Sequence, residues 1–207
     1  MRNRAYQIMA AGTMNVRMFL PLLTILVAGC DNGPQRVAPP LEGARLGGPF
    51  TLTDQAGRTV RESSFAGKYR IVYFGYTFCP DVCPVDVRNI GAGLKAFESR
   101  NTALAGAVVP IFITVDPARD TPPVLSQFVS AFHPRMVGLT GSEAAIARVA
   151  KDYAIYFHKG AMTSGGGYMV DHSRQAYLMD REGKPIALLP AEAGPEAVAA
   201  ELAKWVR

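Results

Sequence analysis

Residues 71–84 have the sequence IVYFGYTFCPDVCP, and this stretch decides how the chain folds. Its first six residues form a continuous apolar run, which is typical of a strand buried on both faces of a sheet. Cys79 and Cys83 follow, between this predicted strand and a predicted helix over residues 85–99. In an α/β sheet, ligands gather at the carboxyl ends of the strands. The sequence therefore places both cysteines where a functional site is expected.

Strand and helix patterns alternate on both sides of this stretch. A hairpin is predicted over residues 50–60, and a second hairpin joins 176–179 to 186–189. The other predicted elements are strands at 108–115 and 137–140, and helices from about 121 to 132, from about 142 to 153 and from 195 onward. Ser142 is the expected N-cap of the second of these helices. This order indicates an α/β domain whose central mixed β-sheet is flanked by helices, with an N-terminal β-hairpin extension.

Composition excludes several classes of protein. Of the 207 residues, 49% are apolar and 19% are charged, which supports a packed core and argues against a disordered chain. Three of the 22 Lys and Arg residues, and none of the 17 Asp and Glu residues, lie within 1–29. The remaining 19 basic and 17 acidic side chains nearly balance, so no basic surface for nucleic acid is expected.

The N-terminal region has the pattern of an export signal. Residues 18–27 (MFLPLLTILV) follow Arg17 and form an apolar run shorter than the ~20 residues that a membrane-spanning helix needs. Such a run is typical of a secretory signal peptide. Residues 14–29 alone form a complete signal peptide, so translation could also start at Met14. Residues 27–30 (VAGC) resemble a bacterial lipobox. The resemblance implies cleavage after residue 29 and lipid attachment at Cys30, with an uncleaved anchor as the alternative.

These features predict three regions in the chain. Residues 1–29 form a lipoprotein signal peptide, residues 30–47 a lipidated cysteine and flexible tether, and residues 48–207 the folded domain. Asp31 resembles an inner-membrane retention signal. We therefore expect a lipid-anchored protein at the inner membrane, with its domain facing the periplasm.

Once Cys30 is lipidated, Cys79 and Cys83 are the two cysteines that remain, in a compartment that permits oxidation. In a helical turn, residues four apart share a face, so this pair can close a disulfide or hold a metal ion. The N-terminus of the following helix favours thiolates. Spacing alone leaves a redox pair, a metal site and a pair of structural cysteines as alternatives.

Three blocks of sequence resemble the Sco/SenC family. They are residues 73–84 (YFGYTFCPDVCP), 114–122 (TVDPARDTP) and 168–173 (YMVDHS), in the order and at the spacing that the family shows. The resemblance implies a thioredoxin-like fold over residues 48–207.

The resemblance also implies that one copper ion binds to Cys79, Cys83 and His172. It implies delivery of this copper to the binuclear copper centre of cytochrome c oxidase, or maintenance of that centre's cysteines in the reduced state. The expected partners are the copper-site subunit of the oxidase, a copper donor and a thiol reductase.

Ligand chemistry leaves the metal open. Two thiolates and one imidazole suit Cu(I) and also hold Cu(II), and zinc fits the same set. A second hypothesis makes the protein an enzyme, a thiol–disulfide reductase with Cys79 and Cys83 as its catalytic redox pair, in which His172 matters little.

Acidic residues near these motifs are further candidates. Asp81 and Asp116 are expected to orient the ligands or to dock the acceptor, although a turn explains Asp116 equally well. Asp120 or Thr121 is expected to cap the helix that follows, and this explains Asp120 more simply than a role at the site.

The remaining histidines and aromatic residues have simpler interpretations. His133 and His158 are expected at the surface, and Tyr73, Phe74 and Phe78 in the core. The Gly-rich stretch 163–167 is expected to be a flexible loop. Such a loop would let His172 engage and release a metal ion, but an ordinary surface loop explains the composition equally well.

Overall fold

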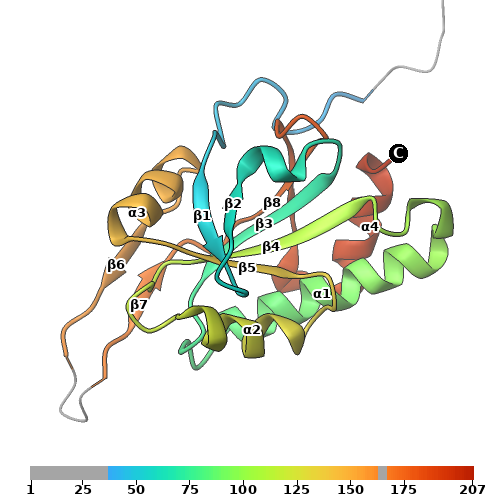
Figure 1. The fold of residues 1–207 in the computed structure, drawn as a ribbon. Coiled ribbons are helices and arrows are strands. Elements are labelled where there is room, and N and C mark those ends of the chain that lie inside the picture. The colour runs from blue at the N-terminus through green and yellow to red at the C-terminus, as the bar shows by residue number, and fades with distance from the viewer. Residues whose placement is uncertain (1–36, 163–166) are drawn as a thin grey trace, which may run out of the picture. The chain divides into compact units, whose positions relative to one another are not determined.

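The computed structural model describes residues 37–162 and 167–207, and its centre is a seven-stranded mixed sheet (Figure 1). The strand order is β2-β1-β5-β4-β3-β8-β9, in which β5, β4 and β3 run parallel and the other pairs are antiparallel. In chain order these strands are β1 (Thr51–Asp54), β2 (Thr59–Arg61), β3 (Tyr69–Gly75), β4 (Val108–Thr114), β5 (Val137–Thr140), β8 (Ala176–Met179) and β9 (Pro185–Leu189). The predicted mixed α/β sheet is confirmed.

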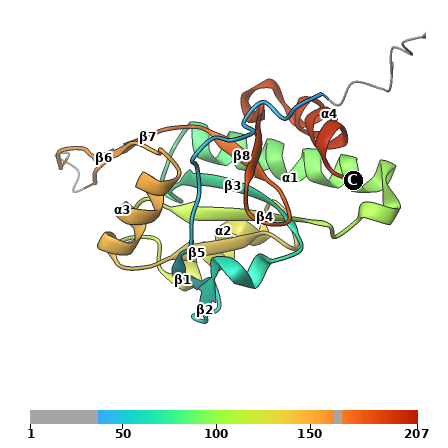
Figure 2. The same ribbon diagram turned by 90° about the horizontal axis from the view of Figure 1, so that it is seen from above.

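Helices cover both faces of this sheet (Figures 1 and 2). The α-helices are α1 (Val82–Arg100), α2 (Pro122–Ser130), α3 (Glu143–Asp152) and α4 (Pro195–Trp205), and the short 3₁₀ helices are Glu62–Phe65, Thr102–Leu104 and Ala191–Ala193. Helices α1, α2 and α4 share one hydrophobic core with Tyr73 and Phe112, whereas α3 shares the other with Phe74.

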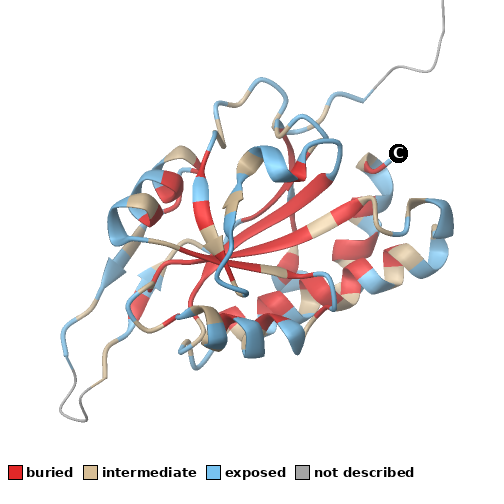
Figure 3. Ribbon diagram, in the orientation of Figure 1, coloured by how far each residue is buried: buried red, intermediate tan, exposed pale blue. Residues whose placement is uncertain are grey.

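Strand β3 lies at the middle of both cores, and all seven of its residues are buried (Figure 3). Ile71 and Tyr73 face one core, and Val72 and Phe74 face the other. This placement explains why the strand has an apolar run instead of an alternating pattern. In the neighbouring β4, Pro110 is tolerated because pairing with β5 starts only at the next residue.

Close packing fixes helix α1, which starts between the two cysteines. A Cβ atom built on Gly93 would lie 2.6 Å from the Cβ of Val198, so the glycine allows α4 to approach α1 closely. At α3 the expected cap is present, because the Ser142 side chain accepts a hydrogen bond from the Ala145 N–H at 3.2 Å.

A second, two-stranded sheet was not predicted from the sequence. β6 (Phe157–Lys159) and β7 (Val170–His172) pair antiparallel and form a hairpin that projects from the main sheet in both views (Figures 1 and 2). His172 is the last residue of β7 and precedes the predicted strand at 176–179, which is β8. Most of the Gly-rich stretch, residues 163–166, lies outside the described residues.

The expected signal peptide and Cys30 also lie outside the described residues, and the expected tether is described only from Val37. Within it, the Leu41 N–H donates to the Ile186 carbonyl at 3.0 Å, and the Gly47 N–H donates to the Asp152 carbonyl at 2.8 Å. Leu41 and Leu46 also pack against the core that contains Phe74. This part of the segment is therefore attached to the domain. Across residues 37–162 and 167–207, no helix combines the length and apolar character needed to cross a membrane.

Candidate metal centre

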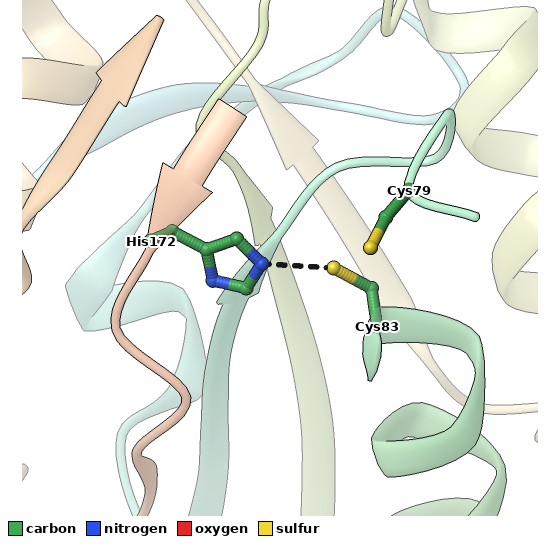
Figure 4. A group of neighbouring side chains, drawn as sticks. All are labelled: Cys79, Cys83 and His172. Carbon is green, nitrogen blue, oxygen red and sulfur yellow. Dashed lines mark hydrogen bonds between the residues drawn. The ribbon is translucent and has the colours of Figure 1, made fainter. Parts of the chain in front are cut away.

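Three separate elements bring Cys79, Cys83 and His172 together (Figure 4). Cys79 lies in the loop after β3, Cys83 is the second residue of α1, and His172 ends β7. The two sulfur atoms and one imidazole nitrogen all lie within 4.8 Å of one another. Cys83 and His172, which are 89 residues apart in sequence, therefore meet at one point, with Cys83 Sγ 2.9 Å from His172 Nε2.

The orientation of the His172 ring leaves one nitrogen available as a ligand. Its Nδ1 lies 2.8 Å from the Ser173 carbonyl oxygen, which can only accept a hydrogen bond. Nδ1 is therefore the protonated nitrogen, and the lone pair of Nε2 faces Cys83. Burial lowers the pKa of His172 below its ordinary value, so the ring is neutral at pH 7 and suited to metal binding.

Tyr73 and Tyr76 hold the His172 ring in place from two sides. Both rings stand nearly perpendicular to the imidazole, with centroid distances of 6.4 Å for Tyr73 and 5.9 Å for Tyr76. Such edge contacts are favourable for aromatic rings and restrict their rotation. The imidazole is thus oriented before any metal ion arrives.

The two cysteines differ in environment. Cys83 is fully buried, and burial, together with Cys79 and Asp86, raises its pKa above the ordinary value. Cys79 is half-buried; burial raises its pKa, but hydrogen bonds from backbone N–H groups, including those of Cys83 and Asp81, lower it overall. We expected the helix N-terminus to favour the thiolate form of both cysteines. This is correct for Cys79, in the loop before the helix, whose pKa is lowered. It is wrong for Cys83, whose pKa is raised.

Gly75 provides the space that lets Cys83 approach the sheet. A Cβ atom at this position would lie 3.1 Å from Cys83 Sγ and 3.0 Å from Cε2 of Phe112. These distances are shorter than ordinary van der Waals contacts. The glycine at the end of β3 thus explains how the first turn of α1 can bury a sulfur atom.

An ion pair that we did not predict links the two elements carrying Cys83 and His172. Asp86, buried in α1, accepts two hydrogen bonds from the Arg174 guanidinium, at 2.8 and 3.1 Å. It accepts a third from the Tyr73 hydroxyl at 2.9 Å. Asp86 lies three residues after Cys83, on the same helix face, and that spacing is the sequence signal that could have revealed it.

The predicted acidic residues occupy different positions. The Asp81 carboxylate is exposed, and this residue contributes its backbone N–H to the Cys79 sulfur. Asp116 is buried, where it accepts hydrogen bonds from the Arg119 guanidinium and, at 2.7 Å, from the Tyr168 hydroxyl. Asp116 therefore ties the turn after β4 to the segment that leads into β7.

Asp120 does not cap α2, because the cap position belongs to Thr121. It is fully buried and accepts hydrogen bonds from the backbone N–H of Thr77 at 3.0 Å and from its hydroxyl at 2.6 Å. The Thr114 hydroxyl donates to the same carboxylate at 2.6 Å. Asp120 thus fixes the loop that leads from β3 to Cys79.

Two expectations about other side chains were wrong. Phe78 is 53% exposed, because its ring packs against the Arg119 guanidinium, 5.1 Å from the ring centroid, outside the core. His133 is only 2% exposed; its Nε2 lies 3.8 Å from Glu98, and its Nδ1 accepts a hydrogen bond from the Arg135 N–H. Tyr73 and Phe74 are buried and His158 is exposed, as expected.

The donor set restricts which metals fit this site. Two cysteine sulfurs and one imidazole nitrogen are soft and borderline donors, which suit copper and zinc, whereas magnesium and calcium require oxygen ligands. The protein is therefore a mixed α/β domain with a Cys₂His candidate metal centre at the carboxyl end of a central strand.

Comparison with known proteins identifies the family. The family model described as SCO1/SenC matches residues 38–207, and the chain belongs to this family. Protein sco1 of Schizosaccharomyces pombe is 39% identical over 163 residues, which cover 78% of this chain and 61% of that protein. Protein SenC of Rhodobacter capsulatus is 41% identical over 158 residues, which cover 75% of this chain and 68% of that protein.

A solved structure agrees with this assignment. The structure of Bradyrhizobium japonicum ScoI with copper bound is similar to this chain, with 42% sequence identity and a TM-score of 0.70. The match covers 78% of this chain and 99% of that one. The chain spans between about half and two thirds of the length of the curated relatives it matches.

Proposed function

We propose that this protein is a copper carrier that binds one copper ion through Cys79, Cys83 and His172. It delivers the ion to the binuclear copper centre of cytochrome c oxidase, or keeps the cysteines of that centre reduced. The observation that carries the proposal is the convergence of the three ligand atoms within 4.8 Å. Membership of the SCO1/SenC family, with a copper-bound relative at 42% identity, supports the choice of copper.

The chain's own residues prepare the site for a soft ion. Cys83 Sγ and His172 Nε2 lie 2.9 Å apart and share the thiol proton, which a metal ion replaces when it binds. Of the two cysteines, Cys79 is the more exposed and is the one that an arriving ion reaches first. The carboxylates of Asp81 and Asp116 are proposed to orient the ligands or to contact the acceptor.

The proposal also includes the location. A lipid attached to Cys30 holds the protein at the inner membrane, with the domain facing the periplasm. The support is the sequence VAGC at residues 27–30 after a short apolar run. Mass spectrometry of membrane-extracted protein tests this part, and an unmodified Cys30 in the mature chain would contradict it.

Anaerobic titration of the full chain with Cu(I) tests the metal site. The native protein should bind one ion, and Cys79→Ser, Cys83→Ser and His172→Ala should each lose most of the affinity. His158→Ala provides a matched control, because this histidine lies in the adjacent strand β6 and is exposed. Stoichiometric copper retained by a double Cys79→Ser, Cys83→Ser variant would refute the proposal.

The second candidate function is thiol–disulfide reduction, and the unequal exposure of the two cysteines favours it. The half-exposed Cys79 thiolate would attack an acceptor disulfide, forming a mixed disulfide and releasing one acceptor thiol. Cys83 would then attack Cys79, releasing the second thiol and leaving a Cys79–Cys83 disulfide. Two electrons thus pass to the acceptor, and a partner thiol reductase must return them.

The His172→Ala variant separates the two functions. Under the reductase hypothesis, it should keep both its disulfide exchange and its function in the cell. A variant that exchanges disulfides normally but fails to support oxidase assembly would argue against reduction as the main role. That outcome would favour metal transfer, because loss of the imidazole would then have removed a metal ligand without affecting disulfide exchange.

A further inference from the structure

A third sulfur atom, that of Met169, lies close to the candidate metal centre. Met169 directly precedes β7, three residues before His172. Its side chain is 47% exposed, although methionine is usually a buried residue. The Tyr76 hydroxyl donates a hydrogen bond to Met169 Sδ at 3.9 Å. The thioether is therefore held at the surface, and its position relative to the site is defined.

Tyr76 connects this thioether to the cysteines. Its hydroxyl accepts a hydrogen bond from the Val170 N–H at 3.3 Å, which fixes the phenol against the start of β7. Burial and the nearby Cys79 and Cys83 raise the pKa of Tyr76, and the Tyr76 ring lies 5.9 Å from the His172 ring, centroid to centroid. Tyr76 thus contacts Met169 through its hydroxyl and His172 through its ring.

Exposure increases along the line of sulfur atoms. Cys83 is fully buried, Cys79 is half-buried, and Met169 is exposed. Cys79 and Met169 are therefore the two of these sulfur atoms that an ion exchanging with solvent can reach. The three rotatable bonds of methionine let its sulfur move toward Cys79 without a change in the backbone.

We propose that Met169 is a transit ligand for cuprous copper, which it binds during entry to and release from the site formed by Cys79, Cys83 and His172. The inference rests on the proposed function, namely that this site binds copper. A thioether is a soft, neutral ligand suited to Cu(I), and it needs no deprotonation before it binds.

The proposed step is an exchange of ligands. During release, a bond forms between the ion and Met169 Sδ while a bond to His172 or a cysteine breaks. Copper stays in the cuprous state, so no electrons are transferred, and each thiolate that is freed takes up a proton from water. Entry follows the same steps in reverse.

The β6–β7 hairpin also carries a matched control. Met162 is 63% exposed and lies on the β6 side of the hairpin, three residues after Lys159. Leucine in place of either methionine keeps the size and apolar character and removes the sulfur. The pair Met169→Leu and Met162→Leu therefore separates metal binding from general apolar contact.

Two measurements on the full chain test the proposal. In the first, protein labelled with ¹³C at the methionine methyl groups is titrated with Ag(I), a closed-shell probe for Cu(I). The Met169 methyl signal, assigned by its loss in Met169→Leu, should shift, and the Met162 signal should not. In the second, transfer of Cu(I) from the loaded protein to a soluble chelator is timed. Met169→Leu should slow this transfer severalfold, whereas Met162→Leu should match the native rate.

The outcomes separate this inference from the proposed function. If the native chain binds one equivalent of Ag(I) but the Met169 signal stays unchanged and both variants transfer Cu(I) at the native rate, the transit ligand is refuted and the metal site stands. If the native chain binds neither Ag(I) nor Cu(I), the proposed function fails, and the inference fails with it.

Discussion

At the scale of single residues, the central feature of the site is the proton between Cys83 and His172. The imidazole donates through Nδ1 to the Ser173 carbonyl, so Nε2 accepts from the Cys83 thiol at 2.9 Å. In the metal-free protein both groups are therefore neutral and paired, which avoids an unpaired buried charge. A metal ion that binds here takes the place of the proton and satisfies the same two atoms.

This arrangement predicts how metal affinity depends on pH. The pKa of Cys83 is raised by burial, so the thiol is protonated from pH 6 to pH 8 and must lose its proton on binding. Copper affinity should rise by about tenfold per pH unit over this range for each proton released. The lowered pKa of His172 means that protonation of the imidazole competes only in more acidic solution. Competition titrations at pH 6, 7 and 8 measure the slope, and an affinity that does not change with pH would contradict this reading of the site.

The same scale shows what the sequence reveals about individual residues. Cys79 and Cys83 stand out because two prolines and an aspartate surround them, and His172 stands out only through the block that contains it. The burial of His133 and the exposure of Phe78 were not predictable, because each depends on a partner distant in sequence. Those partners are Glu98 for His133 and Arg119 for Phe78.

At the scale of secondary-structure elements, the ion pair of Asp86 and Arg174 joins α1 to the segment after β7. The carboxylate is buried, whereas the guanidinium is about half exposed. Cys83 lies three residues before Asp86, and His172 lies two residues before Arg174. The ion pair therefore fixes the distance between the elements that carry these two ligands. We expect it to act as a positioning contact for the metal site.

Replacement of Arg174 tests this role. Arg174→Ala leaves Asp86 with the Tyr73 hydroxyl as its remaining hydrogen-bond donor, at a cost of about 1–2 kcal/mol in unfolding free energy. It should also weaken copper binding severalfold, because β7 is then free to shift. Arg100→Ala is the control, since its ion pair with Glu196 is exposed on both sides and is worth at most about 1 kcal/mol. Urea unfolding and copper titration of both variants check the prediction, which is wrong if the two behave alike.

Element prediction succeeded where the hydrophobic pattern is long and failed where it is short. The apolar run that became β3 and the serine cap of α3 gave clear signals. β6 and β7 have only three residues each, and Phe157–Lys159 contains a single apolar side chain, so neither shows a period. His172 lies in this hairpin. The sequence therefore pointed to His172 as a ligand, but it did not predict β7, the strand that positions it.

At the scale of the whole molecule, the attached N-terminal segment limits how far the domain can move from the proposed anchor. If a lipid holds Cys30, ten residues separate it from Leu41, whose backbone N–H is bonded to the domain. An extended chain spans at most about 3.6 Å per residue, so the free tether reaches roughly 35–40 Å. A tether that ended at residue 47 would reach roughly 20 Å further. With the proposed anchor at Cys30, the candidate metal centre would be confined closer to the membrane than a tether ending at residue 47 would allow.

The attachment itself can be tested on the full chain. Leu41 and Leu46 are half-buried against the core that contains Phe74, so Leu41→Ala and Leu46→Ala should each lower the unfolding free energy by about 1–2 kcal/mol, less than for a fully buried leucine. Val37→Ala is the control, because Val37 is 77% exposed and its change should stay within about 0.5 kcal/mol. Copper affinity should be unaffected in all three variants, since the segment bonds to Ile186 and Asp152 and not to the metal ligands. If Leu41→Ala and Leu46→Ala were as stable as Val37→Ala in urea unfolding, residues 41–46 would be free in solution. The longer reach of a tether ending at residue 47 would then apply.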